Sequence, residues 1–293
     1  MKKHYLLFLL LSTLVSAQFN IVASYPYLGK ITKAIGGDKV KVKVLASAKF
    51  DPHFIVPKPS LVPAISRAKL LIANGAGLEI GWLPPLLRSA HNAHVNIGAS
   101  GFLDASRAVR LIDKPKAVSR AYGDVHPEGN PHFAIDPHNV IPIAVLISKK
   151  LSLLDSANKA YYQHNLNQFV GRWKRFLSSF DTRMKKCHGK NIVQYHELYN
   201  YLIKRYKMKK IGNIEPLPGI SPSSKHTLAL IQNMKQNHVK MILQDAYHEK
   251  RTAKFIASKT GAKVVVIPHD VGSVSGTGTL EKFYTSIAQR LCQ

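Results

Sequence analysis

Cysteine, acidic residues and long apolar runs are all scarce in this sequence of 293 residues. Its two cysteines are too few for a disulfide-dense scaffold or for a zinc finger held by four thiolates. Beyond the amino terminus, no run approaches the roughly 20 uninterrupted apolar residues that a membrane-spanning helix requires. A hydrophobic content of 45% and a charged content of 20% are ordinary for a globular protein and exclude an intrinsically disordered chain.

The shortage of acidic residues leaves a large positive charge. The sequence has 42 Lys and Arg against 16 Asp and Glu, which gives a formal net charge of +26. Such a charge suggests nucleic-acid binding, but the basic residues are scattered and no arginine-rich arm or aromatic-interleaved basic ribbon accompanies them. We therefore expect no nucleic-acid partner. The charge is interpreted as a solvated surface, with weak attraction to anionic membranes as a secondary interpretation.

The first seventeen residues have the pattern of an export signal. Lys2 and Lys3 precede an unbroken apolar run over residues 5–11, and the Val-Ser-Ala sequence at 15–17 is a small-residue cleavage pattern. The apolar run is too short for a transmembrane helix, and no cysteine lies near the cleavage site. We therefore expect a signal peptide at 1–17 and a mature periplasmic protein from Gln18 without a lipid anchor.

An oxidising compartment makes Cys187 and Cys292 a candidate disulfide. A bond between them would close a loop of about 100 residues and constrain the unfolded chain by a few kcal/mol in the entropy model. Two unpaired thiols are the alternative, because the sequence does not show how close the two residues lie.

Strand patterns alternate with helix patterns on both sides of one long helical segment, which predicts an α/β fold. In the first half, strands are expected over residues 19–22, 40–45, 70–73 and 95–97, with helices between them. Residues 157–186 keep apolar side chains at a period of 3.6, as a strut between two lobes would. We expect two Rossmann-like lobes, each a parallel sheet flanked by helices. Their bounds are 18–155 for the N-terminal lobe, 156–187 for the linking helix and 188–293 for the C-terminal lobe.

Four histidines occupy strand ends or loops between elements: His53, His132, His196 and His269, with Asp270 beside the last. Open parallel sheets bind ligands beyond the carboxyl ends of their strands, so these side chains are candidates for one site between the lobes. Imidazole with one carboxylate is a ligand set typical of zinc more than of calcium or magnesium. The alternative for each histidine is a loop residue bonded to backbone or water, and position alone leaves both interpretations open.

Two further histidines, His126 and His138, flank the loop that carries His132. An accessory role at the site is one interpretation of this position. We expect both side chains to face solvent instead.

Several motifs, taken in order, resemble the zinc/manganese-type solute-binding proteins of ABC importers. They are Asp51-Pro52-His53 with Pro57-Lys58-Pro59-Ser60, Asn74-Gly75-Ala76-Gly77-Leu78-Glu79 with Trp82, Gly129-Asn130-Pro131-His132 with Asp136-Pro137, Tyr195-His196 with Tyr199 and Tyr201, and Pro218-Gly219-Ile220-Ser221-Pro222. The resemblance implies two α/β lobes joined by a rigid long helix, with one divalent metal held between them. It also implies delivery of that metal to a membrane permease driven by an ATPase. We expect a monomer without enzymatic activity.

The resemblance carries the family's ligand positions onto His53, His132 and His196 directly. The fourth ligand of the family is usually an aspartate followed by Pro-Leu-Gly, whereas this chain reads Pro-His-Asp-Val-Gly over residues 268–272. Alignment on the glycine selects His269, and a shift by one residue selects Asp270. The long His-rich acidic loop of many zinc receptors is also missing.

Three imidazoles favour Zn²⁺ as the transported ion over Mn²⁺ or Fe²⁺, which suit harder ligands. A zinc-dependent hydrolase is the enzymatic alternative, with Glu197 beside His196 as its candidate general base, but the sequence has no His-Glu-x-x-His helix. A receptor for a chelated metal or another small ligand is a further alternative. Its site would need a lining of aromatic and arginine side chains.

Overall fold

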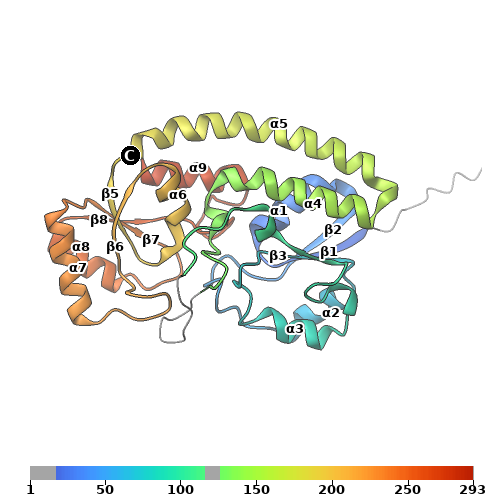
Figure 1. Cartoon of the computed structure of the whole chain (residues 1–293), viewed down its shortest axis with the longest axis horizontal. Helices are drawn as coiled ribbons and strands as arrows, with labels where there is room; N and C mark the ends of the chain where they lie inside the picture. The colour runs from blue at the N-terminus through green and yellow to red at the C-terminus, as the bar shows by residue number, and fades with distance from the viewer. Residues whose placement is uncertain (1–17, 116–125, 293) are drawn as a thin grey trace, which may run out of the picture.

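The computed structural model describes residues 18–115 and 126–292, so the expected signal peptide at 1–17 lies outside the described residues. The described chain forms two parallel sheets of four strands each, in the orders β2-β1-β3-β4 and β6-β5-β7-β8 (Figure 1). This is the predicted α/β architecture of two lobes. No helix within 18–115 and 126–292 is long and apolar enough to cross a membrane.

The N-terminal lobe is built on the first sheet. Its strands and helices are β1 (Phe19–Ala23), α1 (Pro26–Gly36), β2 (Val40–Val44), α2 (Val62–Ser66), β3 (Leu70–Ala73), α3 (Leu83–Ala90), β4 (Phe102–Asp104) and α4 (Val140–Leu154). The expected strand over 95–97 is wrong: Ala93–Val95 is a 3₁₀ turn, and the fourth strand is β4. Only Val95 of these three residues is buried, whereas Asn96 is polar and Ile97 is 62% exposed, so the segment has no second side chain to anchor a strand in the core.

The C-terminal lobe repeats this arrangement. Its elements are β5 (Asn191–Gln194), α6 (Asn200–Arg205), β6 (Lys209–Asn213), α7 (Ser224–Gln236), β7 (Met241–Gln244), α8 (Arg251–Thr260), β8 (Lys263–Val266) and α9 (Leu280–Leu291). All strand pairs are parallel, and the ladder of β5 with β6 shifts register between Ile192 and Val193. The carboxyl ends of these strands therefore open along one edge of the sheet, where ligands of parallel sheets bind.

One helix, α5 (Lys159–Met184), runs along both lobes (Figure 1). Its 26 residues span about 39 Å. It packs on α1 and α4 of the first lobe and on α9 of the second. The buried side chains repeat at helical spacing and include Trp173, whose ring lies 5.6 Å from that of Tyr284 on α9. The buried side chains of α5 belong to one apolar core that continues through both lobes, so α5 connects the two lobes rigidly.

The two cysteines form a disulfide, which is one of the two alternatives that the sequence leaves open. Cys187 follows the carboxyl end of α5, and Cys292 follows α9, so the bond ties the strut to the last helix of the chain. The Cα atoms lie 5.3 Å apart.

Polar contacts reinforce the junction of the two lobes. The Tyr284 hydroxyl donates to the carbonyl of Ala134 over 2.7 Å, and Arg205 Nε pairs with the buried carboxylate of Asp136 at 2.6 Å. The backbone N–H of Tyr27, in the first turn of α1, donates to Oδ1 of Asp270 over 3.0 Å. The C-terminal lobe thus supplies a carboxyl oxygen that caps a helix of the N-terminal lobe.

Candidate metal centre

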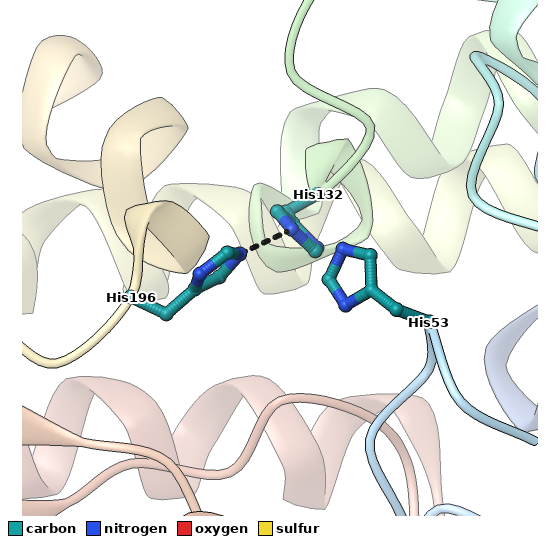
Figure 2. Close-up of side chains that lie close together, drawn as sticks. All are labelled: His53, His132 and His196. Atoms are coloured by element: carbon teal, nitrogen blue, oxygen red, sulfur yellow. Dashed lines mark hydrogen bonds between the residues drawn. The ribbon is translucent and has the colours of Figure 1, made fainter. Parts of the chain in front are cut away.

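Three of the sequence-predicted histidines meet between the lobes. Each of His53, His132 and His196 offers one ring nitrogen, and these three atoms all lie within 4.8 Å of one another. His53 lies in the loop after β2, His132 begins a 3₁₀ turn ahead of α4, and His196 lies two residues after the end of β5. Figure 2 shows the three rings converging from separate segments of the chain.

Local hydrogen bonds hold the loops that carry these histidines. The carboxylate of Asp51 accepts the backbone N–H of His53 over 2.9 Å, and the side-chain oxygen of Asn130 accepts that of His132 over 2.9 Å. The amide of Asn130 also donates to the carbonyl of Glu197 over 2.7 Å, across to the turn after His196. Such turns of Asp and Asn explain why these residue types precede the histidines.

The spacing of the three rings matches a metal site. Their centroids are separated by 5.0 Å for His53 and His132, 5.3 Å for His53 and His196, and 5.0 Å for His132 and His196. A tetrahedral zinc ion with bonds of about 2.1 Å to nitrogen would place two ligating rings roughly 5 Å apart. Nε2 of His53 is buried without a hydrogen-bond partner, while Nε2 of His132 and of His196 lie 3.1 Å apart.

Carboxylates behind two of the rings fix which nitrogen faces the centre. Nδ1 of His53 lies 2.7 Å from Oδ1 of Asp51, and Nδ1 of His196 lies 2.8 Å from Oε2 of Glu215. Each Nδ1–H donates to its carboxylate, so the lone pair of Nε2 is free to bind a metal. Burial alone raises the pKa of Glu215, but hydrogen bonds from His196 and His248 lower it to about 2. Burial also lowers the pKa of His132 well below its usual value, which keeps this imidazole neutral.

The carboxyl ends of β6 and β7 add Glu215, Asp245 and His248 behind His196. Nδ1 of His248 lies 2.7 Å from Asp245, and its Nε2 lies 3.4 Å from Glu215. Burial lowers the pKa of His248, but these two carboxylates raise it to about 10, so its imidazole is protonated at neutral pH. The charge of His248 balances Asp245. Asp51 and Glu215 then supply two negative charges beside the three imidazoles, which complements a divalent cation.

The sequence alone indicates few of these partners. Asp51 has a local signal, because it stands two residues before His53 in the quoted motif. Glu215 and His248 have none, since only the fold brings the ends of β6 and β7 to the end of β5.

The two candidates for the fourth ligand lie outside the group of three histidines. Asp270 is engaged with the N–H groups of Tyr27 and Val271, and burial raises its pKa to about 8. The ring of His269 packs edge-on to Tyr247 at 4.8 Å, and its Nδ1 is buried without a partner. His269 and Asp270 do share a cavity of about 40 Å³ with His132. The choice between them stays a prediction.

His126 does not face solvent, so that expectation is wrong. Its ring stacks on that of His53 with a centroid separation of 5.4 Å, and its Nε2 is buried. Burial and then the neighbouring imidazoles of His53 and His196 lower its pKa to about 3. His138 is half-buried and lies 2.9 Å from Asp181.

The geometry disfavours the alternative functions. Glu197, the candidate general base of a hydrolase, is bonded to Lys210 at 2.7 Å and to Asn213 at 3.0 Å. The cavity beside His132 has a volume of about 40 Å³, which is small for a chelated metal. No arginine is among the described residues that line it.

Two parallel-sheet lobes, one rigid strut and three histidines that converge between the lobes define a two-lobed solute-binding receptor for a metal ion. The chain belongs to the ZnuA family, described as the periplasmic component A of the zinc-uptake complex, whose sequence profile matches residues 21–292. The protein is therefore an extracytoplasmic metal-binding receptor of an ABC importer, and the members of its family are components of transport systems.

Two relatives illustrate the likeness in sequence. The high-affinity zinc uptake system protein ZnuA of Bacillus subtilis is 26% identical over 261 residues, which cover 85% of this chain and 78% of that protein. The metal ABC transporter substrate-binding lipoprotein SloC of Streptococcus mutans is 25% identical over 252 residues, covering 84% of this chain and 79% of that protein.

Solved structures show the same fold. A crystal structure of ZnuA superposes with a TM-score of 0.77 at 25% identity, covering 94% of this chain and 99% of that chain. The solute-binding protein FpvC of Pseudomonas aeruginosa, in complex with Mn²⁺, superposes with a TM-score of 0.78 at 22% identity, covering 94% of this chain and 96% of that chain.

Proposed function

We propose that this receptor captures Zn²⁺ between its lobes through His53, His132 and His196 and passes the ion to its importer. The observation that carries the proposal is the convergence of three ring nitrogens within 4.8 Å of one another. The hydrogen bonds of Asp51 and Glu215 direct Nε2 of His53 and of His196 toward the centre. Burial keeps His132 neutral, as a ligand must be.

The donor chemistry supports zinc over manganese or iron. Within the described residues, the group that could hold an ion consists of imidazoles alone. Borderline ions such as Zn²⁺ suit nitrogen, whereas Mn²⁺ suits carboxylate oxygen. Asp51 and Glu215 neutralise the ion from behind their histidines without presenting oxygen to it. The runner-up is a manganese or iron receptor, and the solved structure of FpvC contains Mn²⁺.

The proposal extends to partners and location. The receptor works as a monomer, delivers its ion to the membrane permease and ATPase of an ABC importer, and has no enzymatic activity of its own. We place it in the periplasm without a lipid anchor. The lipoprotein name of SloC makes the anchor a point to test, by the intact mass of the mature chain from membrane and soluble fractions.

Elemental analysis followed by competitive titration tests the choice of metal. Protein purified without added metal is expected to carry zinc, at up to one equivalent per chain. After chelator treatment, Zn²⁺ should displace a tenfold excess of Mn²⁺. Tighter binding of Mn²⁺ than of Zn²⁺ would overturn the zinc assignment. If His132→Ala keeps wild-type affinity for both metals, the proposed site is overturned. His138→Ala is the matched control, because it removes a nearby imidazole that pairs with Asp181.

A further inference from the structure

His126 lies beside the group of three histidines without an assigned role. Its ring centroid is 5.4 Å from that of His53 and 6.4 Å from that of His132. The first of these distances equals, within a few tenths of an ångström, those among the three converging rings, and the second is about 1 Å longer. His126 therefore stands beside the group of three histidines, nearer to His53 than to His132.

The hydrogen bonding of His126 distinguishes it from His248, an imidazole that also lies near the group of three histidines. The ring of His248 lies 6.3 Å from that of His196, but both of its nitrogens have carboxylate partners, Asp245 and Glu215. Nε2 of His126 is buried and has no hydrogen-bond partner. A buried polar atom without a partner costs about 1–3 kcal/mol, and such an atom beside a metal centre is explained if the ion becomes its partner.

The ring of His126 lies close to the backbone of Gly77. A Cβ atom placed on Gly77 would lie 3.3 Å from Nδ1 of His126, so the ring rests closely over a backbone position with φ of +79° that favours glycine. On the chain side, the carbonyl of His126 accepts the N–H of Gly129 in a turn, which fixes the start of the loop leading to His132. The backbone is thus anchored, and only the side chain has to turn to approach the centre.

We propose that His126 supplies the fourth ligand of the metal, so that the bound ion is held by four imidazoles. This inference rests on the proposed zinc site of His53, His132 and His196 and adds one residue to it. The ring of His126 turns away from its stacked position on His53 and presents Nε2 to the ion. Asp270 stays on the amino terminus of α1, where two backbone N–H groups already hold its carboxylate.

A centre of four neutral imidazoles also fits the charge of the surrounding side chains. The ion keeps its charge of +2, and the carboxylates of Asp51 and Glu215 provide two compensating negative charges through the ligands they contact. If the fourth ligand were itself a carboxylate, the site would have three negative charges against the two positive charges of the ion.

X-ray absorption at the zinc edge tests the proposal on protein loaded with one equivalent of Zn²⁺. The wild type is expected to show scattering from four imidazoles, and His126→Ala from three with one oxygen ligand in exchange. The variant should also bind zinc at least about tenfold more weakly in a chelator competition. His138→Ala is the matched control and should change neither the spectrum nor the affinity.

His126→Phe separates ligation from packing, because phenylalanine keeps a ring on His53 but has no nitrogen. Loss of one imidazole from the spectrum in both His126 variants supports the proposal. An unchanged spectrum in His126→Ala, or wild-type affinity in His126→Phe, overturns it. Loss of an imidazole in His269→Ala instead would assign the fourth ligand to the alternative loop. A wild-type protein that binds no zinc would contradict the proposed function, whereas three imidazoles in the wild type would contradict this inference alone.

Discussion

Nδ1 of His196 lies 2.8 Å from Oε2 of Glu215, and both side chains are buried. The pair sets the tautomer of a proposed metal ligand and places a negative charge one residue away from the ion. Glu215→Gln keeps the shape of the side chain but removes its charge. We expect zinc affinity to fall by about 10- to 100-fold, measured by chelator competition. Glu281→Gln, in the exposed first turn of α9, is the control, and equal affinities for the two variants would contradict this role.

The contact between Asp270 and Tyr27 predicts a structural role for this carboxylate. Asp270→Ala removes the cap of α1 and should lower the free energy of unfolding by about 1–2 kcal/mol in urea titrations. Zinc affinity should change much less. His269→Ala serves as the neighbouring comparison, since its side chain caps no helix. A large loss of zinc affinity in Asp270→Ala with unchanged stability would instead make Asp270 the fourth ligand.

The raised pKa of His248 predicts a pH-dependent contribution to stability. A histidine whose folded pKa is about 10 stabilises the fold fully below its usual value near 6.5, and this contribution is lost as pH rises through 10. His248→Gln should therefore lower the free energy of unfolding of the metal-free protein by about 2 kcal/mol at pH 6, allowing for partial exposure. The difference should shrink toward pH 10. Denaturation at several pH values measures it, and a constant difference would show that His248 is not charged.

The disulfide between Cys187 and Cys292 encloses a separation of 105 residues. On the chain-entropy model, its loss destabilises the fold by about 4–5 kcal/mol. The double variant Cys187→Ala with Cys292→Ala should show this loss in urea titrations, because the bond fastens α9 to the end of α5. Equal stability of reduced and oxidised wild-type protein would contradict the expected contribution.

Much of the fold could be predicted because its signals are local or repeated. The apolar period of α5 shows directly in Leu166, Phe169, Trp173 and Leu177, all of which are buried on one face. The segment at 95–97 shows the limit of this reasoning. Two β-branched residues around an asparagine do not form a strand when only Val95 reaches the core.

The residues of the candidate metal site also divide into those that the sequence indicates and those that only the fold reveals. His53, His132 and His196 follow strands or turns whose position the sequence indicates, and the structure brings their rings together. Glu215 and His248 belong to separate loops, and their contact with His196 depends on strand order. The burial of His126 was missed because loop composition alone predicts a polar residue to be solvated, whereas here the ring packs on another imidazole.

A crystal structure of the zinc-loaded protein with anomalous diffraction at the zinc edge tests the central claim most directly. The account predicts one strong anomalous peak between the lobes, about 2.0–2.1 Å from Nε2 of each of His53, His132 and His196. A principal peak that lacks any one of these three nitrogens within about 2.5 Å, or that lies elsewhere on the molecule, would contradict it.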